Sequence, residues 1–145
     1  MRFIRQDLID EAGLDGLAKM DIAFTGVEKL DDRTEYSMAR SKLLARRNVQ
    51  LRYDPETRVL HAGEKQYLAT ESGLEDFSRE FKAASVAVDA TSLDFSEIAL
   101  LLYAYTFSHK RPRVGFLYVE PQEYVRRPAE AVSYTHLRAH ETPEH

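Results

Sequence analysis

Three oxygen-bearing side chains stand at the end of a short β-branched run. The run is Ser85-Val86-Ala87-Val88-Asp89, and Thr91 and Ser92 come directly after it. An uninterrupted β-branched run of this length is typical of a strand that is covered on both faces. A carboxylate, two hydroxyls and the start of a helix near Leu93 then meet at one turn, which suits a phosphate or another polar ligand. The alternative is that Thr91, Ser92 or Asp94 only caps the helix, because their side-chain oxygens accept hydrogen bonds from its free N–H groups.

Two further polar clusters stand where predicted strands end. Gly26 and Glu28 lie at the exit of the first strand, and Arg33 opens the helix that follows. Glu120 and Tyr124 lie at the exit of the last strand. In an open parallel sheet, ligands bind beyond the carboxyl ends of the strands, at a switch in strand order. We therefore predict one ligand-binding edge, made of Gly26, Glu28, Arg33, Asp89, Thr91, Ser92, Glu120 and Tyr124.

This edge supports three hypotheses about function. In the first, Asp89 binds a ligand hydroxyl, Thr91 and Ser92 bind a phosphate with the helix N-terminus, and Arg33 binds a second anionic group. In the second, Glu28, Asp89 and Glu120 hold Mg²⁺ for a metal-dependent nucleotide or phosphate-ester hydrolase. In the third, the chain is a structural interaction domain whose apolar helix, residues 95–107, packs against a partner. No resident cofactor or metal is predicted outside the hydrolase alternative.

Several kinds of site are excluded or unsupported by the residues present. The chain has no cysteine, which excludes disulfides, thiolate zinc sites, iron–sulfur clusters and a cysteine nucleophile. It also has no G-x-G-x-x-G turn, no Walker A loop and no G-x-S-x-G elbow. We predict that His61 and His109 are surface residues rather than ligands or bases.

The periodicity of apolar residues predicts the elements that position these clusters. The predicted strands are residues 20–27, 49–53, 58–61, 85–89 and 114–119, with a further strand optional at 66–68. The predicted helices are residues 33–47, with Tyr36, Ala39, Leu43 and Leu44 facing inward, 71–83, and 93–109, which is apolar nearly all round. This order predicts an α/β class: a Rossmann-like three-layer domain with a mainly parallel sheet and a short antiparallel hairpin at residues 49–61.

Charge and hydropathy limit the partners. The formal net charge is −4, which argues against general nucleic-acid binding because contact with the phosphate backbone needs a basic face. Arg40, Lys42, Arg46 and Arg47 could form a local basic patch, but we interpret them as the solvated face of the predicted helix. No run approaches the length of a membrane span or a signal sequence, so we expect a cytoplasmic protein that does not contact a membrane.

Residues 132–145 resemble one translated reading frame of a transposase-type sequencing-library adapter. We expect these residues to be a non-native, disordered tail and exclude them from the fold. The expected domain is therefore a single unit, residues 1–131, whose first 19 residues form a helical lead-in. The natural chain is expected to continue beyond Ala131, so the protein is expected to be truncated.

The central turn, Asp89-Ala90-Thr91 after a buried strand, is similar to the D-x-T-G-G-T-K turn of CRISPR-associated Rossmann-fold (CARF) sensor domains. That resemblance implies binding of a cyclic oligonucleotide at this edge, usually by a homodimer, and an appended effector. Ser92 and Leu93 stand in place of the two glycines, and no lysine follows.

A wider resemblance joins three segments of the chain. It resembles uncharacterised bacterial α/β proteins with G-x-E…R, D-x-T-S and Y-x-E-P-x-x-Y segments. The matching residues are Gly26-Val27-Glu28 with Arg33, Asp89-Ala90-Thr91-Ser92, and Tyr118-Val119-Glu120-Pro121-Gln122-Glu123-Tyr124. The resemblance implies the Rossmann-like fold and these site residues, but no activity. The leading hypothesis is therefore a nucleotide-sensing module of a larger, defence-type bacterial protein.

Overall fold

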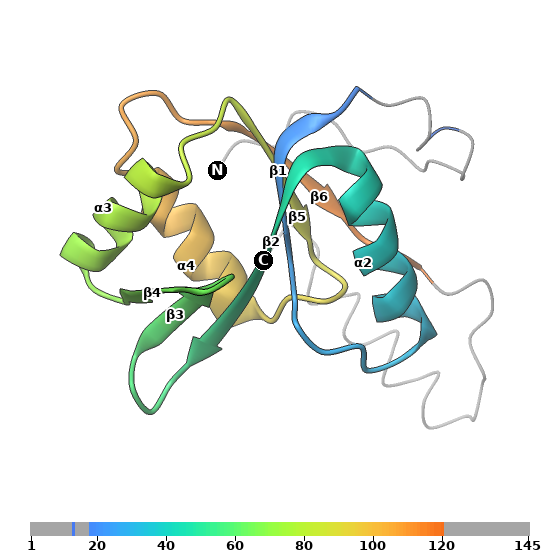
Figure 1. Cartoon of the computed structure of the whole chain (residues 1–145), viewed down its shortest axis with the longest axis horizontal. Coiled ribbons are helices and arrows are strands. Elements are labelled where there is room, and N and C mark those ends of the chain that lie inside the picture. The colour runs from blue at the N-terminus through green and yellow to red at the C-terminus, as the bar shows by residue number, and fades with distance from the viewer. Residues whose placement is uncertain (1–12, 14–17, 121–145) are drawn as a thin grey trace, which may run out of the picture.

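The computed structural model describes residue 13 and residues 18–120 (Figure 1). The described elements, in chain order, are β1 (Met20–Thr25), α2 (Asp32–Leu44), β2 (Ala45–Asp54), β3 (Val59–Ala62), β4 (Lys65–Leu68), α3 (Glu71–Glu80), β5 (Ser85–Asp89), α4 (Phe95–Tyr105) and β6 (Arg113–Leu117). The α/β class is therefore confirmed. The adapter-like tail lies outside the described residues, and so does the predicted lead-in except for Gly13, which is helical and half-buried, and the exposed Ala18 and Lys19.

The six strands form one mixed sheet in the order β4-β3-β2-β1-β5-β6. Strands β2, β1, β5 and β6 are parallel, whereas β3 and β4 are antiparallel to their neighbours. The parallel part and the hairpin of β2 and β3 agree with the prediction, and β4 is the strand that the pattern left optional. The chain leaves β1 for β2 on one side and later returns to β5 on the other side of β1. Strand order therefore switches between β1 and β5.

The end of the first predicted helix was wrong. Helix α2 stops at Leu44, and Arg46 and Arg47 belong to β2. The reason is the ladder with β1, which begins with Ala45 opposite Met20. Backbone hydrogen bonds to a central strand outweigh the helical propensity of this basic segment.

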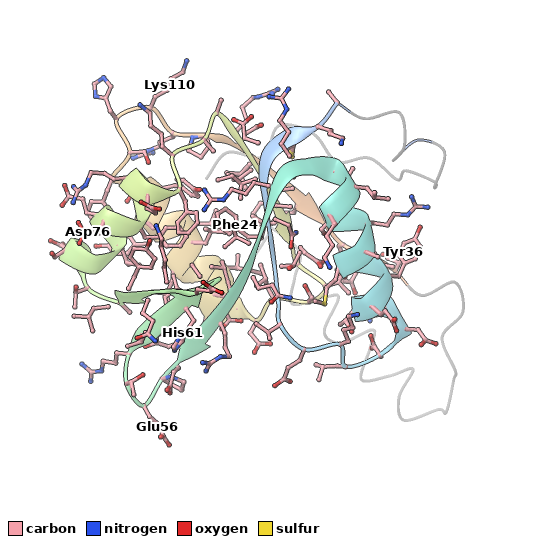
Figure 2. The ribbon with its side chains drawn as sticks, in the orientation of Figure 1. Phe24, Tyr36, Glu56, His61, Asp76 and Lys110 are labelled. Carbon is pink, nitrogen blue, oxygen red and sulfur yellow. The ribbon has the colours of Figure 1, made fainter. Side chains whose placement is uncertain are left out.

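The helices cover the two faces of the sheet unequally. Among the described helices, α2 covers one face, and α3 and α4 lie together on the other (Figure 1). The prediction that Tyr36, Ala39 and Leu43 face inward was wrong, because Leu43 is 61% exposed, Ala39 is exposed and Tyr36 lies on the outer side of α2 (Figure 2). The buried side of α2 carries Thr34, Ser37, Met38 and Ser41. The sheet beneath presents alanines, and small side chains on both elements allow the helix to approach closely.

The opposite face holds an aromatic core around Phe24, whose position at the centre of the fold is visible in Figure 2. The ring centroid of Phe24 lies 5.9 Å from that of Phe77, which in turn lies 4.7 Å from that of Phe81. Tyr105 completes the cluster and donates a hydrogen bond from its hydroxyl to the Phe81 carbonyl, at 2.7 Å. Burial raises the pKa of Tyr105 above its ordinary value, so this hydroxyl remains a donor at neutral pH.

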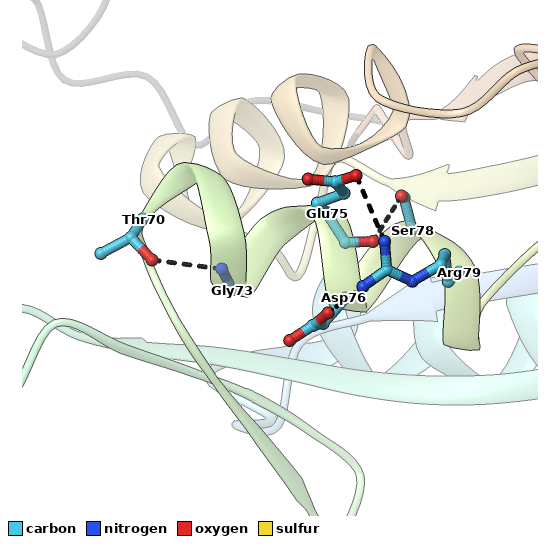
Figure 3. A network of polar contacts seen from close by, with 6 residues as sticks. All are labelled: Thr70, Gly73, Glu75, Asp76, Ser78 and Arg79. Carbon is cyan, nitrogen blue, oxygen red and sulfur yellow. Dashed lines mark hydrogen bonds and ion pairs between the residues drawn. The ribbon is translucent and has the colours of Figure 1, made fainter.

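Local contacts cap the first turn of helix α3 and connect side chains along its exposed face (Figure 3). The Thr70 hydroxyl accepts a hydrogen bond from the Gly73 N–H at 3.1 Å, which caps the first turn. Arg79 forms ion pairs with Glu75, at 3.2 Å, and with Asp76. Leu74 and Phe77, together with Phe81 just beyond the helix, are buried, and the helix predicted over residues 71–83 is confirmed over Glu71–Glu80.

Helix α4 departs from the expectation of a helix buried nearly all round. Leu101, Ala104 and Tyr105 are buried, but Phe95 is 85% exposed and Tyr103 is 46% exposed. The helix therefore presents an aromatic residue to solvent in its first turn. Among the described residues, no helix is both long enough and apolar enough to cross a membrane.

Candidate functional site

The loops after β1 and β5 leave the sheet side by side. The register pairs Phe24 with Val88, so the two strands end at the same level, and both loops lie at the lower edge of the sheet in Figure 1. This is the carboxyl edge of the parallel strands, at the point where strand order switches. The structure therefore brings together five predicted site residues, namely Gly26, Arg33, Asp89, Thr91 and Ser92.

Asp89 lies beneath this edge and faces α2. Its side chain is 1% exposed, and its Oδ2 accepts hydrogen bonds from the hydroxyls of Ser37, at 2.9 Å, and Ser92, at 2.6 Å. Its Oδ1 accepts from the backbone N–H groups of Thr91, at 3.1 Å, and Ser92, at 3.4 Å. Four donors replace the water that a buried carboxylate loses. Asp89 thus fixes the turn that follows β5 and ties it to α2.

Gly26 joins the end of β1 to the same turn. Its N–H donates to the Ser92 hydroxyl at 2.9 Å, and this hydroxyl in turn donates to Asp89. A Cβ atom at Gly26 would lie 2.1 Å from the Ser92 carbonyl oxygen. Only glycine permits this close approach of the two backbones.

Val119, just beyond β6, is held at both of its backbone polar groups. Its N–H donates to the Thr91 hydroxyl at 2.9 Å. Its carbonyl accepts from Nε and Nη2 of Arg33, at 3.0 and 2.7 Å. The guanidinium of Arg33 also lies over the Tyr118 ring, 5.3 Å from its centroid. Arg33 and Thr91 therefore clamp the exit of β6 against α2 and the turn after β5.

The backbone of the turn after β5 has no spare donors. The N–H of residue 90 donates to the Leu117 carbonyl, and those of residues 91 and 92 both donate to Oδ1 of Asp89. The N–H of residue 93 donates to the Asp89 carbonyl, and that of residue 94 donates to the Glu97 carboxylate. Asp94 is the N-cap of α4, which confirms one of the three predicted caps. The turn is a closed structural unit, and groups that remain available to a ligand lie around it.

Sequence reasoning missed Ser37 and Thr25. Ser37 connects α2 to Asp89, and its only signal was membership of a small-residue run on α2. Thr25 is fully buried, and its Oγ1 lacks a hydrogen-bond partner among the described residues. It shares the α2-facing side of β1 with Ala23 and lies next to Asp89 in the sheet.

The surface around the turn is acidic. Glu28 and Glu120, two predicted site residues, are both exposed. Further exposed carboxylates in the same loops and in the first turn of α2 belong to Asp31, Asp32, Glu35 and Asp94, against the basic residues Lys29 and Arg33. The Thr34 N–H donates to Asp31, which lowers the pKa of this carboxyl below its ordinary value. A bare anion would therefore meet an unfavourable field here.

The three carboxylates of the hydrolase hypothesis are not assembled. Glu28, Asp89 and Glu120 do not form a group that could hold a metal ion, and neither does any other trio of His, Cys, Asp or Glu in the described residues. His109 is exposed as predicted, whereas His61 is half-buried in β3. Tyr124 lies outside the described residues.

Apolar side chains rim the acidic surface. Leu30 is 74% exposed and Val27 45% exposed in the loop after β1. Phe95 at the start of α4 and Tyr118 beyond β6, 52% exposed, complete the rim. The edge thus combines carboxylates, one partly engaged guanidinium and two aromatic rings.

No protein-family model, no curated protein and no solved structure matches this chain. Function is therefore argued from the site alone.

Proposed function

We propose that this chain is a Rossmann-like, cytoplasmic domain that binds a nucleotide, or another phosphate-bearing ligand, at the carboxyl ends of β1, β5 and β6. In a longer bacterial protein it would act as the sensor module. The observation that carries the proposal is the switch in strand order between β1 and β5, beside a turn braced from three sides. Switch points are where open α/β sheets bind ligands.

In this proposal the ligand contacts side chains around the turn that have unused hydrogen-bonding groups or exposed rings. Glu28 accepts hydrogen bonds from ribose hydroxyls, and Phe95 and Tyr118 offer faces for a base. Arg33 uses two N–H groups on Val119 and has others for a phosphate oxygen. The oxygen atoms of Asp89, Thr91 and Ser92 already form hydrogen bonds within the turn or with Val119. Direct contacts of these three side chains with a ligand stay predictions. In this proposal they shape the edge.

The acidic surroundings add a condition on the ligand. The exposed carboxylates outnumber the basic groups, so a nucleotide binds as its Mg²⁺ complex, in which the metal offsets the phosphate charge. The metal comes with the ligand. No cluster of three protein carboxylates is needed for this role.

Thermal unfolding of the full chain with a nucleotide panel, with and without Mg²⁺, tests the proposal. A ligand at about a hundred times its Kd stabilises the folded state by about 2.7 kcal/mol, which raises Tm by at least about 5 °C. Glu28→Gln removes the charged acceptor and should weaken binding roughly tenfold. Glu56→Gln, on the exposed turn between β2 and β3, is the matched control and should bind normally.

Two outcomes contradict the proposal. In one, no nucleotide raises Tm with or without Mg²⁺. In the other, Glu28→Gln responds as strongly as the unmodified chain.

A protein-interaction domain is the second candidate, and one observation favours it. Phe95 is 85% exposed at the start of a helix, and solvent-facing aromatic residues are typical of binding surfaces. Sedimentation of the full chain over a concentration series should then show association that Phe95→Ser abolishes. A monomer at every concentration, together with no ligand response, would count against this candidate.

A further inference from the structure

Basic residues gather at the opposite edge of the sheet, where the four parallel strands begin. They come from the last turn of α2 and from the starts of β1, β2, β5 and β6, which are far apart in sequence. We call this set the basic edge: Lys19, Lys42, Arg46, Arg47, Lys82, Lys110, Arg111 and Arg113, all exposed. Lys110 projects from it at the top of the view in Figure 2.

Acidic residues barely offset this charge. Within residues 18–21, 42–47, 82–85 and 108–113, the one acidic residue is Asp21. Its Oδ2 accepts from the Ala84 N–H at 2.8 Å, and its Oδ1 lies 3.9 Å from Nη1 of Arg46. Arg47 lies over the Phe81 ring, 4.8 Å from its centroid, and its charge also acts on the Glu80 carboxylate at the end of α3, whose ion pair is with Lys65. Most of the positive charge therefore faces solvent.

The overall charge of −4 conceals this separation. Around the carboxyl ends of the parallel strands the exposed charges are mostly carboxylates, and around the amino ends they are mostly bases, so the two ends of these strands differ in local charge. This arrangement arises because α2 ends at Leu44, which places Arg46 and Arg47 at the start of β2, beside the starts of the other parallel strands. Local charge, not net charge, decides what such a surface attracts.

We propose that the basic edge binds the sugar–phosphate backbone of a nucleic acid without reading its sequence. Neighbouring strands lie about 4.8 Å apart, so the starts of β2, β1, β5 and β6 form a row about 14 Å long. A row of cations of that length fits a linear polyanion and contacts several successive phosphates. The backbone phosphates, rather than the bases, supply the binding energy.

The composition of the edge favours nucleic acid over an acidic protein. Interfaces between proteins are centred on apolar and aromatic side chains and are depleted in lysine. Here half of the basic residues are lysines, and Leu43 is the one exposed large apolar side chain in the same stretches. Protein–nucleic-acid interfaces are polar and strongly positive, as this edge is.

Fluorescence anisotropy with a short labelled single strand and the corresponding duplex tests the proposal on the full chain. Contact with about four phosphates gives a slope of about −3 for log K against log salt with the single strand. Affinity should therefore fall roughly 50-fold between about 50 mM and about 200 mM salt. Scrambling the sequence of the strand should leave the affinity unchanged.

A matched pair of charge reversals localises the binding. The variant Lys82→Glu with Lys110→Glu alters the basic edge and should lose at least about tenfold in affinity. The control, Lys29→Glu with Arg52→Glu, changes the net charge equally at exposed sites elsewhere and should bind within about twofold of the unmodified chain. Neither variant breaks an ion pair or hydrogen bond within the described residues, so both should unfold at the same temperature.

Four results would overturn the proposal. The first is the absence of binding at low salt, and the second is an equal loss in the control, which would mean diffuse attraction. The third is binding of poly-glutamate in preference to DNA, which would identify an acidic polypeptide as the partner. The fourth is salt-sensitive self-association that Lys82→Glu with Lys110→Glu abolishes, which would place a second copy's acidic edge there. Glu28→Gln should not affect nucleic-acid binding, so this proposal and the nucleotide proposal fail independently.

Discussion

The two faces of the sheet are stabilised by different kinds of contact. The face under α3 and α4, the aromatic face, is filled by large side chains such as Phe24, Phe77 and Phe81. The face under α2, the small-residue face, presents Ala23, Ala87 and their neighbours. The stability of the aromatic face depends on how well large side chains fill its volume and on the apolar area that they bury. That of the small-residue face depends on close backbone approach and on hydrogen bonds to one buried carboxylate.

This difference explains why the candidate site lies where it does. The hydrogen bonds of the small-residue face converge at the carboxyl ends of β1 and β5, through Ser37, Asp89 and Ser92. The aromatic face contributes no polar group to that point. We therefore expect the aromatic face to supply most of the stability and the small-residue face to shape the candidate site. The following substitutions test this difference between the two faces.

Phe77→Ala should produce the largest loss of stability. Phe77 is fully buried among aromatic rings, and truncation leaves a cavity that costs about 3–5 kcal/mol. Urea unfolding monitored by circular dichroism measures this cost. A loss below about 1 kcal/mol would mean that the aromatic face does not dominate stability.

Asp89→Ala should cost about 3 kcal/mol although it removes little apolar area. It removes the shared acceptor of four donors: the hydroxyls of Ser37 and Ser92 and the N–H groups of Thr91 and Ser92. Asp89→Asn keeps the shape and one acceptor oxygen, so it should cost less in the same unfolding assay. Equal losses in the two variants would show that the shape and the one remaining acceptor oxygen contribute nothing, so that the fold needs both oxygens of the carboxylate.

Gly26→Ala should cost about 1–3 kcal/mol through overpacking. The added Cβ meets the Ser92 carbonyl oxygen, which belongs to backbone and cannot rotate away. The amide NMR signals of the turn after β5 should shift, while those of the aromatic face should not. Unchanged stability would contradict the close approach of the two backbones.

Thr25→Val should increase the free energy of unfolding, in contrast to the three preceding substitutions. The Thr25 hydroxyl is buried without a partner in the described residues, so replacing it with a methyl group should stabilise the fold by about 1 kcal/mol. A higher midpoint in urea would confirm this. Destabilisation would mean that the hydroxyl has a partner in the folded protein.

Asp31→Asn should have the smallest effect, confined to stability as a function of pH. The Thr34 N–H lowers the pKa of Asp31 in the folded state, so the carboxylate stabilises the fold above its unfolded pKa. That contribution is lost as the pH falls through the lowered folded-state pKa. The slope of Tm against pH in the acid range should therefore be shallower in the variant. Identical slopes would show that the carboxylate of Asp31, the N-cap of α2, is not coupled to folding.

Strands and helices with strong local patterns were predictable. Ser85–Asp89 was identified from an unbroken apolar run, and α3 from its apolar period. The boundary between α2 and β2 was not predictable, because it depends on pairing with β1 across the chain. The inward side of α2 was missed for a related reason. Its buried residues are mostly small and polar, and they are buried only because the sheet beneath carries alanines.

The candidate site was predictable in its location but not in its internal contacts. The alternation of strands and helices and the polar residues after the strands predicted that Gly26, Asp89 and Thr91 lie at one edge. Sequence could not show that Asp89 has four donors or that Val119 is clamped by Arg33. Such contacts depend on distances between segments far apart in the chain. Charge separation between the two edges was hidden for the same reason.

Mapping amide NMR shifts on the full chain during titration with a Mg²⁺–nucleotide tests the central claim most directly. The proposal predicts saturable shifts at Gly26 to Glu28, at the start of α4 and at Tyr118 to Glu120, with no change around Phe77. Shifts at Lys19, Arg46, Lys82 and Arg113 instead would place the phosphate at the basic edge. That result, or no shift at the carboxyl edge at saturating ligand, would contradict the assignment of this edge as the ligand site.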